Sequence, residues 1–335
     1  MKKGAKLNSS PSFPFIVFLL SLSMVLPASA VSPVAMPAGV APDRLVTEVL
    51  WDSLVRLPVG RRPRVVLVLG GGGARGLSHI GVLRVLEQER IPVDQIVGVS
   101  VGALVGALYA AGLPVEKIEA MAGQVGWNQL TDFSNFSMVK LILSDELLST
   151  AKMESYLQSQ IGNMSFSDLK IPFTCLATDL RTGDRVVFNE GSVALAARAS
   201  ATIPAIFKPV KYRQRLLVDG GLVDNLPTDI VSGDGQNFIL AVMPNGEDMS
   251  GEVTNVLKAL VRSIDIQKDT LMKLKKSKAD VLIEPDVQRI SMVDLGKSKE
   301  CVDAGALAGR KAALEIKKLM IERTLKMNVN GPVAP

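Results

Sequence analysis

The chain has 335 residues, 47% of them apolar and 4% aromatic, which is enough for one large α/β domain or two small ones. The formal charge of +5 falls to +2 without the first thirty residues, which carry Lys2, Lys3 and Lys6, and no basic run is interleaved with aromatic residues. This balance argues against nucleic acid as a partner. One histidine and two cysteines without zinc-type spacing argue against a metal site.

The first thirty residues have the pattern of a secretory signal peptide. Their basic start precedes an apolar stretch at 13–26 and the small-x-small sequence Ala28-Ser29-Ala30 that a signal peptidase needs. The apolar stretch has about fourteen residues, whereas a membrane span needs roughly twenty. We therefore predict that residues 1–30 are a cleaved signal peptide and that the protein is exported to the periplasm or cell envelope, or secreted. An uncleaved anchor is the alternative.

Strand and helix patterns alternate along the rest of the chain. The apolar runs 64–69 and 96–99 predict buried strands, each followed by a helix. Later strand patterns lie at 173–179, 185–188, 215–218, 237–242 and 280–284, helical patterns lie at 191–200, 252–276 and 297–323, and residues 127–165 are less regular. This alternation predicts a three-layer α/β/α fold with a mostly parallel sheet, made mixed by a hairpin of 173–179 with 185–188.

The same patterns suggest how the chain is organised. Residues 31–62 are expected to form a Pro- and Gly-rich linker and a short helix. We predict a single catalytic domain over residues 63–285 and a helical extension, 286–335, packed on it. Cys175 and Cys301 are expected to be free core thiols, although an oxidising compartment would permit one bridge between them.

A G-x-S-x-G sequence at 98–102 stands between a predicted strand and a predicted helix. A nucleophile at such a junction sits on a sharp turn whose crowded backbone tolerates only small neighbours, here Gly98 and Gly102. The helix that follows places its positive dipole end near the reacting centre. The pattern therefore makes Ser100 the candidate nucleophile.

A glycine-rich loop follows the first strand. Its glycines leave backbone N–H groups free to converge on one point, which suits the oxyanion of an acyl-transfer intermediate. The candidate oxyanion-binding residues are Gly71, Gly72, Gly73, Arg75 and Gly76. The same loop matches the G-x-G-x-x-G fingerprint of dinucleotide-binding proteins, with Asp94 near the position of a ribose-binding acid, so a Rossmann-type protein is an alternative.

The third motif is Asp219, directly after the apolar run 216–218 and before Gly220 and Gly221. An acid at a strand end lies at the sheet edge where active sites gather. The only histidine, His79, precedes the serine, whereas in α/β-hydrolases the histidine follows the acid. Either His79 acts in an unusual geometry or an acid acts directly on the serine, and we favour the second, with Asp219 as the base.

These three motifs in this order resemble the patatin-like phospholipase family, in particular its bacterial branch, which is similar to the catalytic domains of neuropathy target esterase. The resemblance covers about residues 64–285 and includes the stretches 77–83 and 199–209. It implies a patatin-like fold, a dyad of Ser100 and Asp219, no metal or other cofactor, and hydrolysis of phospholipid or lysophospholipid esters.

Lipid substrates also imply a peripheral contact with a membrane. The apolar residues 133–148 and the lysines within 268–278 are the candidate contact segments. A non-catalytic envelope protein that retains a lipase fold is a further alternative function. The sequence carries no signal for the oligomeric state.

Overall fold

The computed structural model describes residues 42–126, 130, 147–233, 235–245, 259, 262–263, 266 and 275–330. The chain divides into two compact units, Met1–Leu45 and Val46–Pro335, and the strands of the described residues all lie in the second. Several predictions fall largely or wholly outside the described residues: the signal peptide 1–30, most of the linker, the segment 133–146, most of the helix 252–276, and the lysines at 268 and 273. The domain boundaries that we infer from sequence remain predictions.

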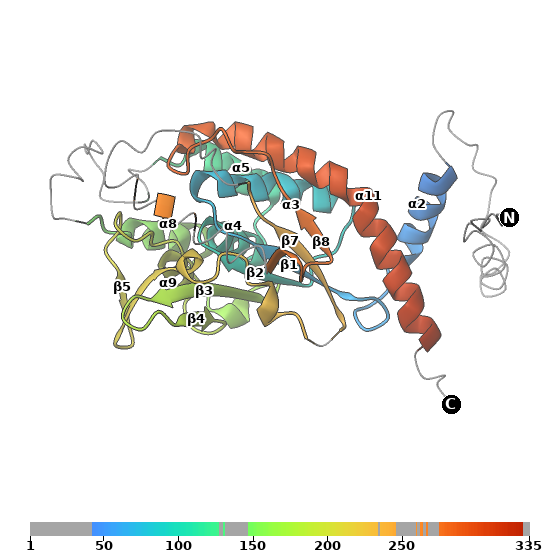
Figure 1. The fold of residues 1–335 in the computed structure, drawn as a ribbon, viewed down its shortest axis with the longest axis horizontal. Coiled ribbons are helices and arrows are strands. Elements are labelled where there is room, and N and C mark those ends of the chain that lie inside the picture. The colour runs from blue at the N-terminus through green and yellow to red at the C-terminus, as the bar shows by residue number, and fades with distance from the viewer. Residues whose placement is uncertain are drawn as a thin grey trace, which may run out of the picture. The chain divides into compact units, whose positions relative to one another are not determined.

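An eight-stranded sheet runs through the second unit in the order β5-β6-β3-β2-β1-β7-β8, with β4 paired to β3 (Figure 1). The strands are β1 (Arg64–Leu69), β2 (Gln95–Val99), β3 (Phe173–Asp179), β4 (Arg185–Phe188), β5 (Val210–Tyr212), β6 (Arg215–Asp219), β7 (Asn237–Val242) and β8 (Val281–Ile283). Neighbours from β3 to β8 are parallel, whereas β4 and β6 run antiparallel to β3 and β5 runs antiparallel to β6. The predicted mixed sheet and its hairpin are therefore confirmed.

Both faces of the sheet are covered, which explains why β1 is a continuous apolar run. Leu67 and Leu69 pack in the cluster that contains residues of α3 (Ser78–Gln88), α4 (Val101–Ala110) and α9 (Val193–Ser200). Val66 and Val68 point to the other face and pack against residues of the 226–231 segment, which includes the short helix η4 (Thr228–Ile230). The structure thus confirms an α/β fold with a mixed central sheet and flanking helices.

Two elements differ from the sequence predictions. Helix α8 (Ala151–Ile161) lies in the region that we expected to be irregular, and its buried residues recur at the helical spacing of Met153, Leu157 and Ile161. Strand β5 escapes prediction because it has only three residues, and it is joined to β6 by a tight turn with positive φ at Arg213 and Gln214. The other α-helices of the described residues are α2 (Pro42–Leu54), α5 (Val115–Gln124) and α11 (Ser298–Asn330).

Helix α11 packs closely along α3, as Figure 1 shows. A Cβ atom on Gly81 would lie 1.9 Å from the carbonyl oxygen of Val302, and one on Gly305 would lie 1.9 Å from that of Ser78. Further along α11, the buried Lys317 ammonium bonds Glu89 at 2.7 Å and Glu48 at 2.8 Å. Backbone contact at one point and a buried cation at the other therefore fix α11 against α3.

The two cysteines are free and buried, as the sequence suggests. Burial raises the pKa of the Cys175 thiol on β3, and it raises the pKa of Cys301 on α11 to about 11. Both thiols therefore stay protonated and pack as small apolar groups. None of the helices in the described part of the chain combines the length and hydropathy that a membrane span requires.

Candidate active site

Ser100 lies at the junction of β2 and α4 in a conformation that L-residues rarely adopt, with φ 56° and ψ −128°. The turn is crowded on both sides. A Cβ atom on Gly98 would lie 2.7 Å from Cα of Ala103, and one on Gly102 would lie 2.3 Å from the carbonyl oxygen of Leu69. The sharp turn predicted from G-x-S-x-G is therefore present, and both glycines are needed for it.

Asp219 ends β6, and its side chain meets the serine. Ser100 Oγ donates a hydrogen bond of 2.6 Å to Asp219 Oδ2, while Oδ1 accepts a 2.7 Å bond from the N–H of Gly221. Ser100 and Asp219 are each only 4% exposed. A Cβ atom on Gly220 would lie 2.3 Å from the carbonyl oxygen of Leu176 on β3, so the D-G-G sequence lets this turn approach the sheet. The fold thus brings the two residues into direct contact across 119 positions of sequence.

Three further residues hold the pair in place. Ser200 Oγ accepts a 2.9 Å bond from the N–H of Ser100, and the carbonyl oxygen of Thr202 accepts a 2.7 Å bond from the N–H of Asp219. Thr178 on β3 donates its hydroxyl to the carbonyl oxygen of Asp219 at 2.9 Å. These bonds fix the backbone on both sides of the Ser100–Asp219 contact. Sequence reasoning assigned no role to any of the three.

The glycine loop lies between β1 and the short helix η1 (Gly73–Leu77) and faces the serine. A Cβ atom on Gly71 would lie 3.1 Å from Cβ of Ser100. The N–H of Gly71 donates to the carbonyl oxygen of Asn225, whereas those of Gly72 and Gly73 donate to no group in the part of the chain that the structure describes. The two unpaired N–H groups thus directly follow Gly71, the loop residue that packs on Ser100.

Arg75 and Gly76, the other predicted oxyanion residues, are buried within η1. The Nε atom of Arg75 donates to the carbonyl oxygen of Gly72 at 3.4 Å, so the guanidinium braces the loop from within. Its Nη1 atom is buried and has no partner among the described residues. Arg75 thus places a positive charge beside the loop, which would favour an anion there.

His79 makes a structural contact. It is wholly buried, and burial lowers its pKa to about 4, although the hydrogen bond to Gly70 opposes that shift. The neutral ring donates from Nε2 to the carbonyl oxygen of Gly70 at 2.8 Å. His79 therefore supports the start of the glycine loop, in line with an acid rather than a histidine acting on the serine.

Two residues outside the sequence-predicted set also shape the loop. The backbone carbonyl oxygen of Asn225 accepts a hydrogen bond from the N–H of Gly71. Its side chain fills the space beside two glycines: a Cβ atom on Gly71 would lie 2.3 Å from Asn225 Oδ1, and a Cβ atom on Gly221 would lie 2.5 Å from it. The carbonyl oxygen of Met292 accepts the N–H of Ala74 at 2.8 Å. Asn225 thus joins the loop to the aspartate turn, and Met292 holds it from the C-terminal region.

Asp94, the candidate ribose-binding acid, has a different position and different partners. It precedes β2, at the edge of the sheet opposite to the glycine loop, which follows the parallel strand β1. Its carboxylate bonds Arg62 at 2.6 and 2.9 Å and accepts the N–H of Val65 at 2.8 Å. A dinucleotide site needs this acid at the carboxyl edge. The geometry therefore opposes the Rossmann alternative.

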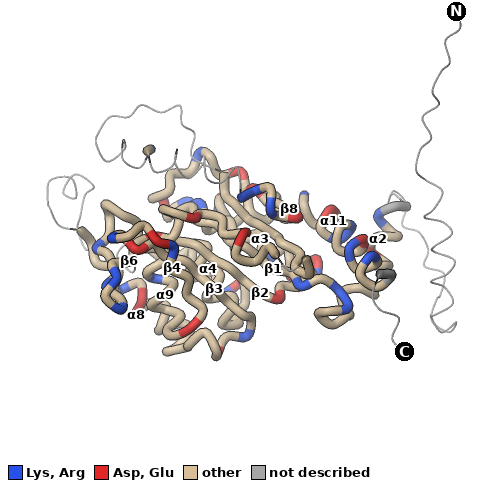
Figure 2. Tube along the Cα trace, turned by 60° about the horizontal axis from the view of Figure 1, so that its bottom comes forward, with Lys and Arg blue, Asp and Glu red and all other residues tan. Residues whose placement is uncertain are grey.

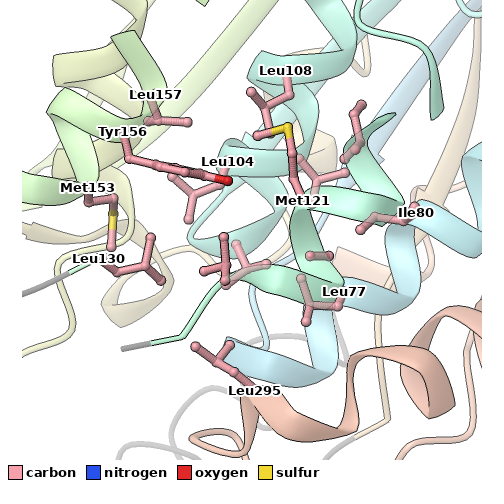
Figure 3. Close-up of a pocket in the computed structure, with 15 residues that line it drawn as sticks. Leu77, Ile80, Leu104, Leu108, Met121, Leu130, Met153, Tyr156, Leu157 and Leu295 are labelled. Carbon is pink, nitrogen blue, oxygen red and sulfur yellow. The ribbon is translucent and has the colours of Figure 1, made fainter. Parts of the chain in front are cut away.

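The structure contains an apolar cavity of about 90 Å³, whose lining side chains Figure 3 shows. Its lining includes Leu77, which follows Gly76, and Val101, which follows Ser100. Helices α4, α5 and α8 supply most of the remaining walls. The described residues contain no cluster of His, Cys, Asp or Glu side chains that could hold a metal ion. The chemistry visible here is that of a buried serine, a carboxylate, unpaired amides and an apolar cavity.

The three motifs lie within a region that matches a known protein family. Residues 67–232 match the family model described as patatin-like phospholipase, and this range contains the glycine loop, the serine turn and the aspartate turn. The chain carries a patatin-like phospholipase domain. The patatin-like match ends well before Met292, so the contact of that residue with the glycine loop lies outside the family model.

Curated relatives carry the name of the same family branch. An uncharacterized NTE family protein of Mycobacterium tuberculosis is 29% identical over 289 residues, which are 78% of this chain and 48% of that protein. Lysophospholipase NTE1 of Candida glabrata is 28% identical over 73% of this chain and 16% of its own length. This patatin-like chain thus spans about half the length of the first mycobacterial relatives that it matches.

A solved structure supports the fold. VipD from Legionella pneumophila superposes with a TM-score of 0.50 at 13% sequence identity, covering 79% of this chain and 68% of that one. At this level of identity the likeness concerns the patatin-like fold alone.

Proposed function

We propose that the chain is a serine acyl-hydrolase that cleaves ester bonds of phospholipids or lysophospholipids, with Ser100 as nucleophile and Asp219 as general base. The observation that carries this proposal is the 2.6 Å hydrogen bond from Ser100 Oγ to Asp219 Oδ2 within a buried site. A hydroxyl needs an adjacent base to become a nucleophile, and Asp219 is within the distance for proton transfer.

The reaction would proceed in two halves. Ser100 Oγ attacks the acyl carbonyl as its proton passes to Asp219, and the tetrahedral intermediate collapses to an acyl-enzyme when Asp219 returns the proton to the leaving alcohol. Water then attacks the acyl-enzyme as Asp219 accepts its proton, and Asp219 returns that proton to Ser100 Oγ when the ester bond to the serine breaks and the fatty acid leaves. One carboxylate thus serves as base and acid in both halves.

The oxyanion of each intermediate would lie against the glycine loop. The N–H groups of Gly72 and Gly73 have no partner among the described residues and directly follow Gly71, which packs on Ser100, and Arg75 bonds the carbonyl oxygen of Gly72. The start of α4 adds the positive end of its dipole at Ser100. Each donor in such a hole contributes roughly 3–4 kcal/mol to lowering the barrier.

The lipid substrate class rests on the family and on the apolar cavity beside the serine. A relative named as a lysophospholipase is consistent with the same class of ester. The test is lipidomic: incubate purified protein with mixed phospholipids, lysophospholipids and triglycerides. A substrate class that the wild type consumes and the Ser100→Ala variant leaves intact identifies the activity.

A fluorophosphonate probe provides the matched control, because it labels only an activated serine. Ser155→Ala removes an exposed serine hydroxyl from α8 and leaves the site untouched. We expect the wild type and Ser155→Ala to be labelled and Ser100→Ala to remain unlabelled. If the folded wild type neither reacts with the probe nor consumes any lipid, the chain is a non-catalytic envelope protein with a lipase fold.

We also infer that residues 1–30 direct export and are cleaved, since their basic start, apolar stretch and Ala28-Ser29-Ala30 site fit a signal peptide. Peripheral contact with a membrane would then bring the site to its lipids. Mass spectrometry of the protein recovered from cell fractions tests the cleavage. A mature N-terminus at Val31 in the envelope or medium supports it, and an intact Met1 in a membrane pellet supports the anchor instead.

A further inference from the structure

The apolar cavity begins where both chemical motifs end. Leu77 is the residue after Gly76 in the glycine loop, and Val101 is the residue after Ser100, and both line the cavity. The loop and the start of α4 pack closely there, since a Cβ atom on Gly76 would lie 3.0 Å from Cβ of Val101. An ester carbonyl held between Ser100 and the loop would thus lie within one residue of two walls of the cavity.

From that point the cavity follows α4. Val101, Leu104, Val105 and Leu108 line it at the spacing of one helical face, which extends about 10 Å along the helix axis. Figure 3 shows Leu108 and Met121 close together, away from Leu77 and Leu295. The cavity thus has a beginning beside the serine and an end where α4 meets α5.

We propose that this cavity holds the first carbons of the substrate's acyl chain, and that Met121 at its end limits how many carbons it takes. The proposal rests on the proposed acyl-hydrolase function and adds to it the place and depth of acyl binding. The lining is apolar apart from the hydroxyl of Tyr156, so it suits an alkyl chain and not a charged headgroup.

Size sets the expected specificity. The cavity, about 90 Å³, is smaller than a 150 Å³ apolar cavity that binds benzene, so it accommodates part of a long chain while the rest leaves through its open side. Each methylene that enters contributes about fourfold to kcat/KM. The value of kcat/KM should therefore rise from butyrate to octanoate esters and change little between octanoate and palmitate esters.

The experiment measures kcat/KM for p-nitrophenyl butyrate, octanoate and palmitate with the full chain. Leu104→Trp fills the middle of the cavity, and we expect the octanoate-to-butyrate ratio to fall at least about tenfold. Met121→Ala removes the end wall of the cavity, so kcat/KM should keep rising from octanoate to palmitate. We expect the palmitate-to-octanoate ratio of kcat/KM to increase about fourfold or more. Met164→Ala is the control, because it shortens a half-buried methionine that packs on the core away from this cavity.

The outcomes separate this inference from the function on which it rests. If butyrate is hydrolysed and the probe labels Ser100, but Leu104→Trp and Met121→Ala keep the wild-type chain-length profile, the acyl chain binds elsewhere and the inference is wrong. Equal shifts in Met164→Ala would also overturn it. If no ester is hydrolysed and Ser100 stays unlabelled, the proposed function itself fails.

Discussion

Two buried carboxylates on one turn have very different surroundings. Asp219 and Asp224 are each 4% exposed, and the N–H of Asp224 donates to the carbonyl oxygen of Gly220. Asp219 accepts from the hydroxyl of Ser100 and from a backbone N–H. Asp224 instead bonds Arg185 at 2.5 Å and Lys275 at 3.1 Å, in a region where acidic and basic residues lie side by side near β4 and β6 (Figure 2).

The difference shows that burial alone does not define a catalytic acid. A hydroxyl can give up its proton to the carboxylate that it contacts, whereas a guanidinium keeps its proton and only neutralises its partner. Asp229 completes the second arrangement, since it bonds the same Arg185 and Lys275. The turn thus has a hydroxyl-bonded end at Asp219 and a charge-paired end at Asp224.

The largest expected effect is that of Asp219→Asn. The amide keeps the shape of the carboxylate but cannot accept the serine proton, so we expect kcat to fall by about a thousandfold or more. The measurement is octanoate ester turnover, with circular dichroism as the check on folding. Asp224→Asn is the matched control and should retain activity within about tenfold. If folded Asp219→Asn and Asp224→Asn lost kcat to a similar degree, the two carboxylates would not differ in role as expected.

Next in size is Asn225→Ala, which alters the residue that connects the aspartate turn to the glycine loop. We expect kcat to fall about 10- to 100-fold with KM little changed, because the loop donors shift relative to Ser100. The rate of fluorophosphonate labelling should fall with kcat. A lower melting temperature with unchanged kcat per folded molecule would assign Asn225 a purely structural role.

A smaller effect is expected at the charge-paired end. Lys275→Met removes the ammonium shared by Asp224 and Asp229, and we expect the free energy of unfolding to fall by about 2 kcal/mol, less than for a fully buried pair because Lys275 is 23% exposed. Urea unfolding measures the loss. Because this cation takes no part in the proton transfer, kcat should stay near the wild-type value.

The smallest effect is a dependence of stability on acid. Burial raises the pKa of Asp229, but hydrogen bonds from Lys275 and Arg185 outweigh it and lower that pKa to about 2. The native state thus binds fewer protons than the unfolded state between about pH 4 and about pH 2. The stability that the ionised Asp229 contributes through Lys275 and Arg185 is lost as the pH falls through that window. Asp229→Asn should flatten this part of the unfolding curve. An unchanged slope would remove Asp229 from the arrangement.

Much of the fold could be predicted because its signals are local. The strands 64–69, 96–99 and 237–242 are apolar runs that a doubly covered sheet requires, and the structure contains all three. Strand β5 has too few residues to show a pattern. Helix α8 carries the helical spacing of Met153, Leu157 and Ile161, but this short signal stands in a stretch that is otherwise irregular.

Only part of the candidate site could be predicted from the sequence. Ser100 and Asp219 stand in motifs whose spacing is local, so their candidacy followed from sequence, although their contact did not. Met292 bonds the loop through its backbone carbonyl, which any residue possesses. Asn225 does the same, and its side chain also fills the space beside Gly71 and Gly221, a packing role that no sequence pattern reveals. Ser200 lies in a stretch that resembled the family, but a serine beside alanines carries no sign of its bond to Ser100. Such contributions come from proximity, and one sequence does not reveal them.

The contact of Met292 with the glycine loop has a consequence for the order of events in biosynthesis. The serine turn and the aspartate turn leave the ribosome long before Met292, and helix α11, which backs α3 at Gly305, emerges later still. A nascent chain that already carries Ser100 and Asp219 therefore lacks this contact with the glycine loop. The loop gains its bond to Met292 only after both turns have been made, so it is completed later than the turns that it faces.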